Sequence, residues 1–127
     1  MRAEPAPLVV GWVETQAAKE LHTTSITVAE IHYGIRRLPS GRRRDKLANA
    51  VSDVFGGFAW QILSFDHRAA LRYGELVAEL ERRGRAISAF DAQIAAICLC
   101  TDSTLVTRNV DDFADAGVEL INPWQGL

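Results

Sequence analysis

The chain has 127 residues, of which 48% are hydrophobic and 24% are charged. This size and composition fit one domain with a real core and argue against disorder, so we expect a single domain over residues 1–127. The net charge of −2 argues against a protein that wraps nucleic acid by bulk electrostatics, and no apolar run reaches the roughly 18 residues needed to span a bilayer.

In the first half of the chain, the pattern predicts a helix over residues 7–16, which begins at a proline. A short strand follows at residues 21–24. Thr27 is then expected to cap a helix with apolar residues on one face, and the Pro-Ser-Gly sequence at residues 39–41 ends that helix. A further helix is expected over residues 42–55, with the following glycine pair as its stop.

In the second half, residues 60–65 are typical of a strand. Asp66 is expected to cap a long helix that Gly84 ends, and Ser88 is expected to cap a helix rich in small apolar residues, as in helices buried on most sides. Short apolar strands complete the pattern at residues 104–107 and 118–121. Such alternation of helices and strands favours an α/β domain with a mostly parallel sheet.

The two cysteines, Cys98 and Cys100, lie two residues apart in an expected helix. Side chains at this spacing point in different directions, so we expect no disulfide and interpret both thiols as small core residues. Cysteine and histidine show no zinc spacing. The first residues also lack the basic-then-apolar layout of a secretory signal, which makes the cytoplasm the expected compartment.

Basic residues are concentrated in two groups along the chain. The simplest interpretation places them on solvated helix faces and at helix C-termini, which favour cations. The alternative is contact with phosphates or with an acidic partner. The first group comprises Arg36, Arg37, Arg42, Arg43, Arg44 and Lys46, and the second comprises Arg82, Arg83 and Arg85.

Three acidic residues stand out by their position in this pattern. Glu30 and Asp91 lie near the starts of expected helices, and Asp112 follows the strand at residues 104–107. In a parallel sheet, the carboxyl ends of the strands and the first turns of the next helices share one edge, where ligands bind. Carboxylates gathered there suit Mg²⁺ or Mn²⁺, which can activate water and neutralise the charge of a phosphate.

Each of these acids also has an ordinary structural explanation. The sequence from Thr27 to Glu30 matches a capping box, in which the glutamate bonds back to the cap residue. Asp91 lies where the helix dipole favours an acid. Asp112 and its neighbour Asp111 could cap or solvate a turn. Considered singly, each acid leaves both explanations open, and the common edge is what favours a metal site.

Four segments together resemble the PIN-domain ribonucleases, most closely the VapC-like toxins of bacterial toxin–antitoxin pairs. They follow family order and spacing and cover essentially the whole chain. The segments are TSITVAEI at residues 24–31 with YGI at 33–35, ISAFDAQIAA at 87–96, LVTRNVDDF at 105–113, and LINPW at 120–124.

The resemblance implies a three-layer PIN-like α/β domain whose short, mostly parallel sheet is flanked by helices. It also implies an endoribonuclease that depends on Mg²⁺ or Mn²⁺, an RNA substrate, a VapB-like antitoxin partner and a homodimer. Glu30 and Asp91 match acidic metal-site positions of the family. Asp112 is favoured for the last acid, with Asn109 and Asp111 as the alternatives for that position.

The resemblance also suggests supporting residues. Thr107 and Ser25 would orient the site, with Asn109 as a polar neighbour of the last acid. Three arginines would contact RNA or the antitoxin, namely Arg36, Arg37 and Arg43.

One departure from the family pattern concerns the start of the chain. Family members begin with a central strand that ends in a metal-binding aspartate, and residues 1–7 resemble the sequence just beyond that strand. We therefore expect the first strand and its acid to be absent from this chain. Two hypotheses follow: an active ribonuclease toxin, or a catalytically impaired PIN-like module that still binds the antitoxin or RNA.

Overall fold

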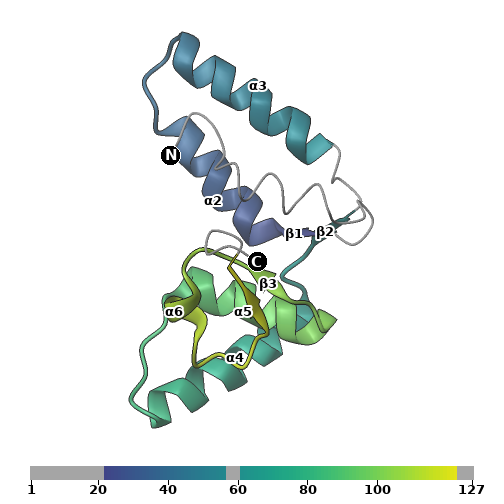
Figure 1. Cartoon of the computed structure of the whole chain (residues 1–127), viewed down its shortest axis with the longest axis vertical. Coiled ribbons are helices and arrows are strands. Elements are labelled where there is room, and N and C mark those ends of the chain that lie inside the picture. The colour runs from purple at the N-terminus through teal and green to yellow at the C-terminus, as the bar shows by residue number, and fades with distance from the viewer. Residues whose placement is uncertain (1–21, 57–60, 123–127) are drawn as a thin grey trace. The chain divides into compact units, whose positions relative to one another are not determined.

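The computed structural model describes residues 22–56 and 61–122 (Figure 1). These residues belong to two compact units, His22–Ser64 and the segment that starts at Phe65, called here the N-terminal and C-terminal units. The helix expected over residues 7–16 lies outside the described residues, as does the start of the strand expected at residues 60–65.

In the N-terminal unit, a parallel pair of two-residue strands accompanies two helices. Strand β1 (Thr23–Thr24) leads directly into α2 (Ser25–Arg36), which packs beside α3 (Arg42–Gly56). The chain then returns to β2 (Ile62–Leu63), which pairs with β1. The helix predicted over residues 42–55 is confirmed, although Gly56 still belongs to it.

The start of α2 differs from the prediction. Thr24 is the N-cap, and its Oγ1 accepts a hydrogen bond from the backbone N–H of Thr27 at 3.0 Å. The predicted cap at Thr27 is therefore wrong, and so is the capping-box explanation of Glu30, which lies exposed in the second turn of α2. Either threonine can satisfy a free helical N–H, and Thr24 does so because the helix begins where β1 ends.

The C-terminal unit contains α4 (His67–Arg82), α5 (Ala89–Thr101) and α6 (Val110–Phe113). Two strands, β3 (Leu105–Val106) and β4 (Leu120–Ile121), pair in parallel, with Leu105 opposite Leu120. The predicted α/β class, with helices flanking short parallel strands, is confirmed. None of the described helices is long and apolar enough to cross a membrane.

The core of the C-terminal unit lies between α4 and α5. Both helices begin as predicted: Asp66 Oδ1 accepts from the Ala69 N–H at 3.0 Å, and Ser88 Oγ accepts from the Asp91 N–H at 3.1 Å. The prediction that α5 is buried on most sides is confirmed by its apolar residues. Buried side chains of this core are Ala69, Leu76, Leu80, Ala92, Ile94, Ala95, Ala96, Ile97, Cys98, Phe113 and Ala116.

Removing the cap of α4 should destabilise the C-terminal unit. We expect Asp66→Ala to lower the free energy of unfolding by about 1 kcal/mol, because the Ala69 N–H loses its partner. Asp66→Ser keeps a capping oxygen, so its free energy of unfolding should be close to that of the unaltered chain. Urea denaturation measures the difference, and equal losses in both variants would show that the cap is not its source.

Cys98 should be chemically inert in the folded chain. It is 4% exposed, and burial raises the pKa of its thiol to about 11. At pH 8 only about one molecule in a thousand then carries the reactive thiolate. In a Cys100→Ser variant, we expect iodoacetamide to leave Cys98 unmodified until urea is added. Rapid alkylation without denaturant, detected by mass spectrometry, would contradict this.

Candidate metal centre

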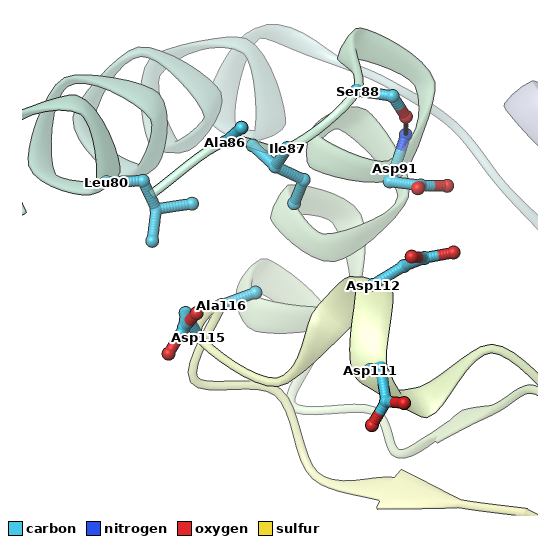
Figure 2. A pocket seen from close by; sticks show the side chains of 9 residues that line it. All are labelled: Leu80, Ala86, Ile87, Ser88, Asp91, Asp111, Asp112, Asp115 and Ala116. Carbon is cyan, nitrogen blue, oxygen red and sulfur yellow. Dashed lines mark hydrogen bonds between the residues drawn. The ribbon is translucent and has the colours of Figure 1, made fainter. Parts of the chain in front are cut away.

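An open hollow of about 530 Å³ lies in the C-terminal unit, where the end of α4, the start of α5 and α6 meet (Figure 2). Four of its lining residues are aspartates, which is unusual because like charges repel one another. The lining residues are Leu80, Ala86, Ile87, Ser88, Asp91, Asp111, Asp112, Asp115 and Ala116.

Asp91 reaches the hollow from the first turn of α5, as predicted. Its backbone N–H donates to Ser88 Oγ, so the cap that starts the helix also fixes the backbone that carries this carboxylate. The side chain is half-buried. The positive end of the helix dipole favours a carboxylate at this position, which lowers the cost of keeping it charged.

Asp112 reaches the same hollow from α6, a four-residue helix that the sequence pattern did not predict. Its backbone N–H donates to the Asn109 carbonyl at 3.1 Å. Figure 2 shows the carboxylates of Asp91 and Asp112 pointing toward the same side, whereas the Asp111 carboxylate points away from them. The arrangement therefore favours Asp112 over Asp111 as the partner of Asp91.

The turn before α6 is held by side-chain hydrogen bonds. Thr107 Oγ1 accepts from the Asn109 N–H at 3.0 Å, and Asn122 Nδ2 donates to the Arg108 carbonyl at 3.4 Å. Asn109 occupies the N-cap position of α6 and is not among the residues that line the hollow. Thr107 thus shapes the backbone that leads to Asp112, and an orienting role for it in the site stays a prediction.

Asp115 differs from the other aspartates of the hollow because it has cationic neighbours. Arg83 Nη2 lies 3.8 Å from its Oδ1, and Arg85 Nε lies 3.7 Å from its Oδ2. In the described part of the chain, no ion pair involves Asp91 or Asp112. Those two carboxylates therefore keep uncompensated negative charge, which favours the binding of a cation.

The donor set of Asp91 and Asp112 fits a hard divalent cation. Both donors are carboxylate oxygens, and Mg²⁺ commonly binds to proteins through one or two carboxylates while it retains several waters. Within residues 22–56 and 61–122, no group of three or more histidine, cysteine, aspartate or glutamate side chains could hold one ion. The pair fits Mg²⁺ or Mn²⁺ and does not fit a zinc site with four protein ligands.

The remaining predicted acid, Glu30, belongs to the N-terminal unit, where it lies exposed on α2. Ser25, a predicted supporting residue, is the first residue of that helix. The structure brings Asp91 and Asp112 together, and the joining of Glu30 and Ser25 to them stays a prediction.

The predicted contact arginines also lie in the N-terminal unit, and all three are exposed. Arg36 lines a hollow of about 290 Å³ between α2 and α3, and the Arg37 guanidinium lies 5.5 Å from the centre of the Tyr33 ring. Both fit a helix C-terminus, which favours cations. Arg43 lies exposed in the first turn of α3, where the dipole disfavours a cation, so the solvated helix face is the part of the simple interpretation that fits this residue.

Sequence reasoning did not single out Asp115 or the contacts of Arg83 and Arg85 with it. These residues are 30 or more positions apart, and no local pattern joins them. The usable signals were indirect, namely the arginine group itself and the glycine between its last two members, which ends α4.

Comparisons with known proteins identify the family. The family model of the PIN domain matches residues 2–119. Over 125 residues, the chain is 40% identical to the plasmid stability protein StbB of Pseudomonas syringae pv. tomato, covering 98% of this chain and 90% of that protein. It is 34% identical, also over 125 residues, to the VapC ribonuclease Y4jK of Sinorhizobium fredii, covering 98% and 89%.

Among solved structures, FitAcB from Neisseria gonorrhoeae matches with a TM-score of 0.90 and 31% sequence identity, covering 97% of this chain and 89% of that one. The expectation that the first family strand is missing is not supported, because the family match already begins at residue 2. Sequence and fold agree, and the chain belongs to the PIN-domain family.

Proposed function

We propose that this chain is a metal-dependent endoribonuclease, the toxin of a VapBC-type toxin–antitoxin pair. The observation that carries the proposal is the carboxylate pair of Asp91 and Asp112, which point to the same side of one hollow and form no ion pair with any described residue. The similarity to a VapC ribonuclease supports RNA as the substrate.

In this proposal Asp91 and Asp112 would hold Mg²⁺ or Mn²⁺, and Glu30 stays the predicted third acid. When bound, the ion would supply an activated water and neutralise charge on the scissile phosphate. Ser88 fixes the helix start that carries Asp91, and Thr107 fixes the turn that leads to Asp112. The chain thus contributes positioning: two carboxylates from different helices are held near one another before the substrate arrives.

The wider assignment follows from the same family. We propose that the whole chain forms one PIN domain, acts in the cytoplasm, assembles as a homodimer and is neutralised by a VapB-like antitoxin. Arg36, Arg37 and Arg43 offer exposed positive charge for RNA or for the antitoxin.

A second candidate function is a catalytically impaired PIN-like module that still binds its antitoxin or RNA. One observation favours it: the described residues contain no group of three acidic, histidine or cysteine side chains able to hold one ion. The two candidates differ in turnover, so cleavage by the unaltered chain separates them.

Cleavage of RNA should depend on the Asp91 and Asp112 carboxylates, which point to the same side of the hollow. With Mn²⁺ present, we expect the chain to cleave RNA, and Asp91→Asn or Asp112→Asn to lower the rate by about a hundredfold or more, because each loses a charged ligand. Glu30→Gln should have a similar effect. Chelation by EDTA should abolish cleavage, and added Mn²⁺ should restore it.

Asp111→Asn is the matched control, because this neighbour lines the same hollow and points away from Asp91. It should cleave within a few-fold of the unaltered chain. An unaltered chain that is as inactive as Asp91→Asn while it still binds an antitoxin would favour the impaired module.

Metal binding should also be visible without any substrate. An ion present at about 100 times its dissociation constant stabilises the folded state by about 2.7 kcal/mol. We expect Mn²⁺ to raise the unfolding temperature of the unaltered chain and of Asp111→Asn, and to leave that of Asp91→Asn nearly unchanged. Equal shifts in all three proteins, measured by differential scanning fluorimetry, would place the ion elsewhere.

A further inference from the structure

The residues that directly follow α4 present two arginines, Arg83 and Arg85, in a fixed geometry. Gly84 has a positive φ of 69°, its N–H donates to the Glu81 carbonyl at 3.0 Å, and the Arg85 N–H donates back to the Leu80 carbonyl at 2.8 Å. This pair of bonds is the Schellman motif, a tight helix C-terminus that needs a left-handed residue. It fixes the backbone between Arg83 and Arg85.

Both guanidinium groups approach a single carboxylate. Arg83 Nη2 and Arg85 Nε lie 3.8 Å and 3.7 Å from the two oxygens of Asp115, beyond ordinary hydrogen-bond length. The three side chains are 48%, 60% and 43% exposed, and such exposed pairs are weak. Arg83 also acts electrostatically on the Glu79 carboxylate, which Arg82 contacts directly. The three side chains of the Asp115 cluster together carry two positive charges and one negative charge, a net positive charge that favours an anion.

This cluster borders the acidic hollow. Asp115 is one of the lining residues, and Figure 2 shows it away from the side to which the Asp91 and Asp112 carboxylates point. RNA carries one negative charge per nucleotide, so the carboxylates repel the strand that the proposed reaction requires. Cations beside the hollow offset that repulsion, and the planar fork of arginine matches a phosphate in two-point contact.

We propose that Arg83 and Arg85 bind a backbone phosphate of the RNA substrate, other than the scissile one, and that Asp115 holds both guanidiniums ready until the phosphate replaces it. The choice of RNA rests on the function proposed above. Both arginines are positioning residues, because they contact the strand beside the reacting phosphate.

Arg82 provides a matched comparison on the same helix end. It is exposed, but its Nη2 and Nε donate to Glu79 Oε2 at 2.8 Å and 3.3 Å. These hydrogen bonds lower the pKa of the Glu79 carboxyl. The Arg82 charge is thus matched by a close partner within its own helix, whereas Arg83 and Arg85 both approach Asp115, a lining residue of the hollow.

The test measures RNA binding separately from cleavage. In an Asp91→Asn background, the probe is a short fluorescein-labelled single-stranded RNA of mixed sequence, titrated at several salt concentrations. We expect Arg83→Gln/Arg85→Gln to weaken binding about tenfold and to reduce the slope of log affinity against log salt by about 0.7, the value for one lost phosphate contact on a single strand. A second, unrelated RNA should show the same losses.

Three variants control for indirect effects. Arg82→Gln should retain the affinity and the slope. Arg83→Lys/Arg85→Lys should retain the salt dependence and lose part of the RNA affinity. Lysine keeps the positive charge but lacks the planar guanidinium that contacts a phosphate at two points. Asp115→Asn should bind RNA at least as tightly as its parent, since the substitution releases both guanidinium groups. If the cluster has only a structural role, RNA binding should be unchanged in every variant.

In the cleavage-competent background, the arginine pair variant should raise KM about tenfold and change kcat by less than about threefold. Binding of the double glutamine variant with the parent's affinity and slope overturns the inference, whether or not the unaltered chain cleaves RNA. Arginine-dependent binding by a chain that never cleaves supports the inference and refutes the proposed nuclease.

Discussion

The packing of α5 against α4 is the constraint on which the acidic hollow depends. Residues 92 and 94–98 of α5 are all buried, so the helix cannot rotate about its axis without disrupting close side-chain packing on several faces. Its first two residues, Ala89 and Phe90, are exposed, and the Ser88 cap sets where the helix starts. The position of Asp91 is therefore fixed by apolar residues that take no part in chemistry.

The negative and positive charges around the hollow lie in different places and do not neutralise one another. Among residues 22–56 and 61–122, no cation pairs with Asp91 or Asp112, which point to one side, while Asp115 has two arginines close to it. A chain under selection for stability alone gains little from this arrangement, because unpaired carboxylates repel and exposed ion pairs contribute little. The separation suits a ligand with both signs of charge, such as a divalent cation together with a polyanion.

Local chemistry made much of the C-terminal unit predictable, since Asp66 and Ser88 each precede a clear apolar pattern and both cap as expected. At α2 the same rule was ambiguous, because Thr24 and Thr27 both suit a cap and the strand pairing of Thr24 decides between them. The four-residue α6 is too short to show helical periodicity. The acids of the site were predictable only as a set, through family spacing.

Helix dipoles and ion pairs account for some of the arginines but not for all of them. Arg36 and Arg37 complement the dipole at the end of α2, but Arg43 lies in the first turn of α3 against it, with no ion pair to any described residue. Arg83 and Arg85 both approach the same carboxylate, that of Asp115, so two positive charges share one ion-pair partner. Concentrated cations on a chain of net charge −2 suit local contact with an anion rather than bulk attraction, which is the arrangement that the proposed RNA contacts need.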